Sequence, residues 1–573
     1  MRVAERRRLT AVARGAAPAD LYVSGGTLLN VYTGELYPAN VAVLGERIAY
    51  VGLRDDMVGA RTVVVDASRR VLAPGYVDPH VHPAHVVTPA ALARHVLALG
   101  TTTLFADTLQ FWELGGARAC TAVADALARS PVKFYWMIRP HAQSRTADEW
   151  RRFPLRDLAR ALAHPSAVAA GEVTRWPDVW AGDRELLRRL DLALARGQRV
   201  EGHTAGASTE RLSAIAAGGL TSDHEPITAR EVLERARQGI AVMLRESSLR
   251  PDLGDLLNAL KDAPGLTARA MLTADGSMPA FVLEHGFVDH LIRTAMQRGV
   301  APLDAYRMAT LNPATYFGKD GELGGIAPGR YADICILRDL AEPRPETVIA
   351  RGRVAAREGR TLVSIPELAW DRVFVTSAAR LSARWRAQPE DFAIPARATF
   401  PVLRLVSAVI TRVEDRAPEP TDLHAALVDR LGRWVAPARL AGFAERVDGL
   451  ATTISTDFNI LVIGRHPASM AHAVNRLLEI RGGVVLVDGD AVAWELPLPL
   501  GGIMTRAELP EAARHERELT GHLTARGYAF HEPFFTLFFL SADFLPAARL
   551  TPMGVWDVKS GRILFPSRRR VGR

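Results

Sequence analysis

Two histidines spaced two residues apart, His80 and His82, are the first side chains along the sequence that suit metal chemistry. They lie in the stretch PGYVDPHVH, which reads as the end of a strand. Residues i and i+2 of a strand project from the same face, so both imidazoles can reach one ion. Such a pair also occurs on surfaces and in cores, so its context must decide its role.

Four further polar residues each stand at the end of a short apolar run, and these are Glu172, His203, His224 and Asp275. Catalytic groups of (β/α)8 barrels lie at the carboxyl ends of the strands. Imidazole and carboxylate groups suit Zn, Mn, Fe or Ni. Four histidines with one bridging carboxylate can hold two divalent ions, so we predict a binuclear metal centre.

Each of these residues also has a purely structural interpretation. His203 can cap a helix, and Glu172 can pair with Arg175. Asp275 precedes Gly276 and can open a turn. The occurrence of all six residues at successive strand ends favours metal binding over these alternatives.

The hydrophobic pattern predicts the elements that position these residues. Short β-branched runs with Gly-rich turns indicate a small β-unit near the N-terminus. Apolar strands then alternate with amphipathic helices, which is typical of an α/β fold with a (β/α)8 TIM-like barrel. The stretch GGIAPGRYADICILRD returns to β character, so we expect the barrel to be inserted in a small β-sandwich.

A connection rich in Pro, Arg and Ala, at about 365–400, precedes further strands and helices that predict a C-terminal α+β domain. The expected division is therefore 1–75 for the first part of the sandwich, 76–320 for the barrel, 321–365 for the returning part of the sandwich, and 366–573 for the C-terminal domain.

Bulk composition excludes several other classes of protein. The two cysteines, Cys120 and Cys335, lie far apart and form no disulfide or zinc pattern, which fits a reducing cytoplasm. No apolar run approaches the roughly 20 residues of a membrane-spanning helix. The densest one, Phe534 to Leu540, has the length of a strand. The basic N-terminal stretch lacks the apolar region of a secretory signal, so we expect a cytoplasmic protein without a membrane partner.

The net charge of +8 comes from arginines spread along the chain, many of them beside acidic residues, as in ARHEREL. A clustered basic patch would indicate nucleic-acid binding. This even spread instead favours a high-GC or heat-adapted composition, so we predict no nucleic-acid partner. Barrel enzymes of this size commonly form dimers or larger assemblies, and we expect a homo-oligomer.

Over nearly its full length the sequence resembles the adenine deaminases of the amidohydrolase superfamily. The resemblance rests on VLAPGYVDPHVH, LGTTTLFAD, EGHTAG, LTSDHEPITAREVLERARQGIAVMLRESS, GRHPASMAHAVNRL, LPLPLGGIM and EPFFTLFFL. It implies His80 and His82 on one metal, and His203 and His224 on the other. It also implies that Glu172 bridges the two metals and that Asp275 lies beside the nucleophilic water.

The chemistry implied is the hydrolytic deamination of adenine, or of a related 6-aminopurine, by a metal-activated hydroxide. Asp275, Glu172 and His224 are the implied catalytic residues, with Mn, Fe or Zn as the metal. Asp275 would accept the proton of the water and pass it to the leaving amine. Glu225 and Glu246 are candidates for binding the ring nitrogens, and Arg245 can hold them.

The sequence departs from the family motifs in four places, at 83–85, 108–113, 286–287 and 454–459. Histidines and other polar residues are lost there, while aromatic residues are gained, namely Phe111, Trp112, Phe287 and Phe458. The metal-ligand positions are not affected. These changes can be neutral, with adenine still the substrate, or they can mark a pocket rebuilt for a larger or less polar substrate. The clustering of the losses favours the rebuilt pocket.

Three functions therefore remain open. The first is the deamination of an aminopurine, and the second is hydrolysis of a different cyclic amidine or amide by the same metal centre. The third is a non-catalytic descendant that binds a ligand. Retention of Asp275 argues against the third function, because an idle metal site has no need of a base.

Overall fold

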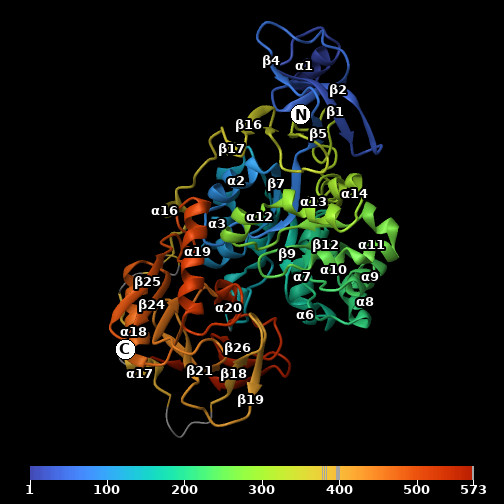
Figure 1. Ribbon diagram of the computed structural model, residues 1–573. Helices are drawn as coiled ribbons and strands as arrows, with labels where there is room; N and C mark the ends of the chain where they lie inside the picture. The colour runs from blue at the N-terminus through green and yellow to red at the C-terminus, as the bar shows by residue number, and fades with distance from the viewer. Residues whose placement is uncertain (147, 377–378, 380, 382–383, 395–399, 571–573) are drawn as a thin grey trace.

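A parallel barrel positions the predicted site residues (Figure 1). The computed structural model describes residues 1–146, 148–376, 379, 381, 384–394 and 400–570. Within these residues, eight strands pair in chain order, and a parallel bridge between Val81 and Asp275 joins the first strand to the last. The barrel prediction is confirmed. Its strands are β6 (Tyr76–Val81), β7 (Thr101–Asp107), β8 (Lys133–Ile138), β9 (Ala167–Val173), β10 (Arg199–Gly202), β11 (Ser222–Asp223), β12 (Ala241–Arg245) and β13 (Met271–Thr273).

The strands are apolar because the barrel buries both of their faces. Every residue of β7 and β9 is buried, as expected for parallel strands covered by helices. Helix α7 buries one face: Leu186, Leu190 and Ala193 are buried, and the Asp183 side chain caps the helix by accepting from the Leu186 N–H. The helices of this region are α2 (Pro89–Ala98), α3 (Leu109–Leu127), α4 (Glu149–Arg152), α5 (Leu155–Leu162), α6 (Trp176–Trp180), α7 (Arg184–Leu194), α8 (Thr209–Ala217), α9 (Ala229–Arg237), α10 (Leu253–Leu256), α11 (Asn258–Asp262), α12 (Pro279–His285), α13 (Val288–Gln297), α14 (Pro302–Met308) and α15 (Leu311–Tyr316).

Strands that precede the barrel in the sequence and strands that follow it together form one β-unit, as predicted. Strand β5 pairs antiparallel with β14, with Pro74 opposite Ile334. Among the described residues the strands form one hydrogen-bonded sheet rather than two separate sheets, and one set of buried side chains from β1, β2, β14 and β15 shares a core. The basic N-terminal stretch forms helix α1 (Val3–Ala13). The strands are β1 (Leu21–Asn30), β2 (Glu35–Leu44), β3 (Arg47–Gly52), β4 (Val63–Asp66), β5 (Val71–Pro74), β14 (Ile334–Leu337), β15 (Thr347–Ala350), β16 (Arg353–Arg357) and β17 (Arg360–Thr361).

The connection at about 365–400 contains helices α16 (Trp370–Val373) and α17 (Pro389–Phe392), and parts of it lie outside the described residues. The predicted α+β domain follows it. Its elements are β18 (Val402–Leu405), β19 (Thr411–Glu414), β20 (Leu423–Val428), β21 (Trp434–Ala441), β22 (Gly449–Thr452), β23 (Ile460–Gly464), α18 (Pro467–Glu479), β24 (Gly483–Asp488), β25 (Ala491–Pro497), α19 (Leu509–Thr524), α20 (Pro533–Phe539), β26 (Ala548–Thr551), β27 (Gly554–Asp557), β28 (Arg562–Pro566) and β29 (Arg568–Arg569).

Two helices of this last domain lie against the barrel (Figure 1). Helix α19 packs beside α12, where the Glu516 carboxylate accepts a hydrogen bond from the Ala280 N–H at 2.8 Å. The apolar run that has the length of a strand forms helix α20, which starts at Pro533, a residue favoured in the first turn of a helix. None of the described helices is both long and apolar enough to cross a membrane. The expected cytoplasmic location stays a prediction.

Candidate metal centre

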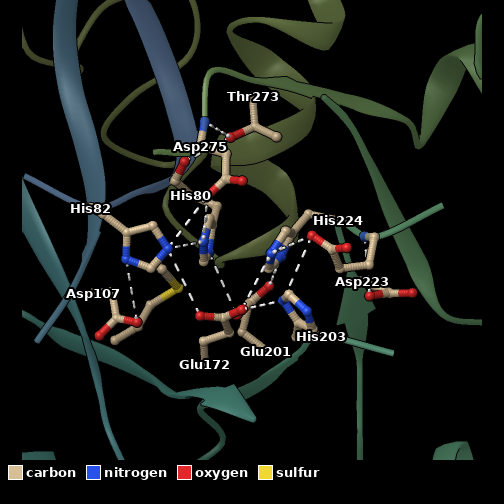
Figure 2. A network of polar contacts seen from close by, with 12 residues as sticks. His80, His82, Asp107, Glu172, Glu201, His203, Asp223, His224, Thr273 and Asp275 are labelled. Carbon is tan, nitrogen blue, oxygen red and sulfur yellow. Dashed lines mark hydrogen bonds and ion pairs between the residues drawn. The ribbon is translucent and has the colours of Figure 1, made fainter. Parts of the chain in front are cut away.

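The six predicted ligand residues meet at the carboxyl ends of the barrel strands (Figure 2). His80 and His82 project from β6 with their Nε2 atoms 3.2 Å apart. Asp275, just beyond β13, places Oδ1 3.4 Å from Nε2 of His80 and 3.3 Å from Nε2 of His82. These three residues form one cluster of potential ligand atoms.

The second cluster comes from neighbouring strands. His203 follows β10 and His224 follows β11. Nδ1 of His203 lies 2.5 Å, and Nε2 of His224 lies 3.4 Å, from Oε1 of Glu172. The other oxygen of Glu172, Oε2, is 3.8 Å from Nε2 of His82. Glu172 therefore faces both clusters, one with each oxygen.

The structural alternative for Glu172 does not hold. Arg175 pairs with Glu149 at 2.7 Å, and Glu172 instead contacts Arg139 at 2.5 Å. Nε2 of the buried His203 has no hydrogen-bond partner within the described part of the chain, and Nδ1 of the same ring points at the Glu172 carboxylate. Since buried polar atoms are normally paired, an unpartnered imidazole nitrogen beside a carboxylate fits a cation. These His, Glu and Asp clusters are suited to a divalent metal.

Charge in the site also favours a cation. Burial alone raises the pKa of the Glu172 carboxyl, but Arg139 and His203 outweigh burial and hold this pKa well below its usual range. For His80, burial and His224 lower the pKa, whereas Glu201 and Asp275 raise it to about 10. The carboxylates are thus ionised and strongly favour positive charge between them.

Three buried residues support the ligands and were not identified from the sequence. Glu201 on β10 contacts Nδ1 of both His80 and His224, at 3.5 and 2.7 Å. Asp107, at the end of β7, lies 3.7 Å from Nδ1 of His82, and Arg139 joins Asp107 to Glu172. The sequence does offer a signal for Glu201, since it is a charged residue within a buried strand. Glu201 also precedes His203 by two positions, so the two side chains project from the same face.

The predicted substrate-binding residues separate into two groups. Arg245 pairs with Glu225, and its Nη1 atom is 3.4 Å from Oδ2 of Asp275. Burial raises the pKa of Glu225, but Arg245 outweighs burial and lowers this pKa to about 2. Glu246 is not brought into this group: its carboxylate accepts from the Leu253 N–H at 3.1 Å. Consecutive residues at the end of a strand point to opposite sides, which turns Glu246 away when Arg245 faces the site.

A cavity with about 690 Å³ of space between its lining atoms, part of it open to solvent, lies above the two clusters. Its floor is polar and includes Glu172, Glu225 and Arg245. Its opposite wall comes from the C-terminal domain and is apolar, with Phe535, Phe538, Phe539, Phe544 and Leu545. The Phe544 ring meets the His203 ring edge-on at 5.1 Å between centroids. The C-terminal domain thus covers the candidate metal centre.

The aromatic residues expected to rebuild the pocket are placed differently from the prediction. Phe111, Trp112 and Phe287 belong to the hydrophobic core, and Trp112 stacks on Phe153. Their sequence positions show only that they lie in the altered stretches, whereas in the fold their side chains pack into the core. Phe458 lines a smaller cavity beside the catalytic one. The aromatic wall itself comes from α20.

The barrel, the histidines at its strand ends and the carboxylates between them together define a hydrolase of the amidohydrolase superfamily. The model of the amidohydrolase family matches residues 71–355, and that of the adenine deaminase C-terminal domain matches residues 407–562. The chain belongs to the adenine deaminase family.

Relatives extend over the whole chain. A putative adenine deaminase of Halalkalibacterium halodurans, BH0637, is 34% identical over 98% of this chain and 97% of its own length. An adenine deaminase of Moorella thermoacetica is 33% identical over 96% of each chain. Among solved structures, the β-aspartyl dipeptidase of Fervidobacterium islandicum AW-1 is 18% identical, covers 60% of this chain and 98% of its own, and has a TM-score of 0.47.

Proposed function

We propose that this protein hydrolytically deaminates adenine or a related 6-aminopurine with two divalent ions, yielding the 6-oxopurine and ammonia. The observation that supports this most directly is the position of Glu172, whose two oxygens face two separate histidine pairs. The names of the full-length relatives point to the same reaction.

His80 and His82 would hold one ion, His203 and His224 the other, and Glu172 would lie between them. Mn, Fe and Zn all suit this donor set. When bound, the ions would supply Lewis-acid activation of water near neutral pH.

Asp275 is the proposed proton carrier. Contacts with His80 and His82 outweigh burial and hold the pKa of its carboxyl well below the usual range, so the group is ionised and can accept a proton. Its Oδ1 faces the two histidines, whereas its Oδ2 faces Arg245 and the cavity. From this position the carboxyl accepts a proton from water and donates it to the departing amine.

Glu225 and Arg245 would bind and orient the purine edge. The ionised Glu225 carboxylate accepts from ring N–H groups, and Arg245 fixes its position. The phenylalanines of α20 offer faces on which a flat heterocycle can stack, and they exclude water from the cavity.

A second candidate is hydrolysis of a larger or less polar cyclic amidine or amide at the same centre. The aromatic wall contributed by α20 and Phe544 favours it. The two candidates share the metal centre and differ only in the molecule that fills the cavity.

Two measurements on the purified full chain test the proposal. Metal analysis should give close to two divalent ions per chain, and fewer than one would refute the binuclear centre. Ammonia release should then be compared for adenine, other 6-aminopurines, nucleosides and cyclic amides with Mn- or Fe-loaded protein. Turnover of amides without turnover of any aminopurine would favour the second candidate.

A further inference from the structure

A second cavity, here called the side pocket, adjoins the catalytic cavity. It has about 390 Å³ of space between its lining atoms, part of it open to solvent, and its walls come from the barrel and from the C-terminal domain. His85, Phe535 and Phe538 line both cavities, so the two spaces adjoin at these side chains. An arm on a substrate above the metal centre would have to pass these side chains to reach the side pocket.

The side pocket is almost entirely apolar. Its walls are formed mainly by aliphatic and aromatic side chains, including Val86, Met278, Ile454, Phe458, Ile503 and Phe534. Three of the four sequence stretches that depart from the family motifs meet here, since 83–85, 108–113 and 454–459 each contribute lining residues. Sequence changes that lie far apart along the chain therefore meet in the lining of the side pocket.

Three polar side chains interrupt the apolar lining, namely His85, Gln110 and Ser455. Gln110 is only 1% exposed, and neither Oε1 nor Nε2 of its amide has a hydrogen-bond partner within the part of the chain that the structure describes. Burying an unpaired amide costs free energy, so such groups are normally satisfied by protein, water or ligand. An unpaired donor and acceptor next to a catalytic cavity mark a binding position.

The Gln110 backbone is held firmly beside the catalytic residues. It belongs to the first turn of α3, directly after β7, and Asp107 accepts from the Leu109 N–H at 2.6 Å. Asp107 also contacts His82 and Arg139. The network that orients the metal ligands therefore also fixes where α3 begins.

We propose that the side pocket binds a substituent of the substrate, namely a short apolar arm that ends in a carboxamide and pairs with the Gln110 amide. This rests on the proposed aminopurine deamination and narrows its substrate class. The apolar walls take the methylene groups of the arm. Gln110 accepts from the N–H group of the carboxamide through Oε1 and donates to its carbonyl oxygen through Nε2.

The test compares two ligands that differ only at the end of the arm. Purines with a propanamide arm and with an isopentyl arm have nearly the same shape, and each pair is prepared with the arm at N6, C2 or C8. Binding to the full metal-loaded chain is measured by calorimetry, which does not depend on turnover. At one arm position we expect the carboxamide ligand to bind at least about tenfold tighter than its alkyl counterpart.

Gln110→Leu should remove or reverse this preference, because the substitution removes the amide that pairs with the carboxamide. Gln238→Leu on the outside of the barrel, where Gln238 contacts Ser213, is the matched control and should keep the wild-type preference. Turnover of adenine and the thermal unfolding temperature are followed in each variant to detect misfolding.

The possible outcomes are distinguishable. Equal binding of the two arms at all three positions in the wild-type chain would refute the side-pocket proposal and leave Gln110 paired with water only. Adenine turnover in that case would leave the proposed function intact. Preferential binding of the carboxamide arm without turnover of any aminopurine would support the side pocket and refute the deamination.

Discussion

The Glu201 carboxylate accepts a hydrogen bond from Nδ1 of His224 at 2.7 Å, on the side of the imidazole that faces away from Glu172. An ionised carboxylate can only accept, so Nδ1 carries a proton, and in the neutral imidazole Nε2 keeps a free lone pair that can bind a metal. The second oxygen of Glu201 faces Nδ1 of His80 at 3.5 Å. One buried side chain thus fixes the orientation of a histidine in each of the two clusters.

Glu201→Gln should weaken metal binding although Glu201 is not a proposed ligand. The amide keeps the size of the side chain but loses the negative charge that orients both imidazoles. We expect a loss of metal affinity of roughly 10- to 100-fold, measured by competition with a chelator. Glu210→Gln, an exposed glutamate on α8, is the matched control. Equal metal affinity in Glu201→Gln and wild type would show that this contact has no part in the centre.

Asp275→Asn should abolish turnover while leaving the metal content nearly intact. The asparagine amide cannot carry the proton from water to the leaving amine. Ammonia release and metal content are measured on the same samples. Asp252→Asn changes a neighbouring carboxylate that also contacts Arg245, at 3.6 Å, and should stay close to wild type. Near-normal activity of Asp275→Asn would mean that another group is the base.

Glu225→Gln and Glu246→Gln form an informative pair, because the sequence made both residues candidates and the structure separates them. Loss of the ionised acceptor at Glu225 should lower kcat/KM by at least about tenfold, mainly through KM. Glu246 bonds to Leu253 N–H outside the cavity, and glutamine can keep that bond. Steady-state kinetics with adenine should therefore show a large effect only for Glu225→Gln. Equal effects of the two substitutions would contradict this assignment.

The interface between α12 and α19 should make stability depend on pH. Burial, and secondarily Glu532, raise the pKa of the Glu516 carboxyl from 4.5 to about 8. The folded chain therefore holds a proton there that the unfolded chain releases, so the free energy of unfolding falls as pH rises from about 4.5 to about 8. Each unit of pKa difference corresponds to about 1.4 kcal/mol.

Glu516→Gln should flatten this dependence and raise stability at pH 8, while the hydrogen bond to Ala280 is kept. Urea unfolding at pH 5.5 and pH 8 measures the effect. Glu511→Gln on the same helix, exposed to solvent, is the control. Parallel pH profiles for Glu516→Gln and wild type would count against a buried proton at this position.

The barrel and the proposed ligand residues could be predicted because strand periodicity and strand ends determine which side chains point to the site. His203 and His224 directly follow strands, which is visible in the sequence. Glu201 was missed because a single glutamate in a strand of four residues does not reveal its partners, which lie on β6 and after β11.

The aromatic side chains that cover the metal centre could not be predicted either, and the reason is different. Phe535 and Phe538 both contact the ring of His85, which lies more than 400 residues earlier in the chain, and a short apolar run suits a strand or a helix equally well. Only tertiary packing shows that the run forms α20 and lies over the barrel. Likewise, Phe111 and Trp112 occupy the expected sequence positions but point into the core.

The pairing of β5 with β14 also affects how the protein is made. On the ribosome, Val71 to Pro74 emerge early, whereas their partners Ile334 to Leu337 emerge only after the whole barrel has been translated. Until then, one edge of the N-terminal sheet has open hydrogen-bonding groups and can pair with other chains. Nascent chains stalled within the barrel should thus be prone to aggregation, and synthesis of β14 ends that exposure.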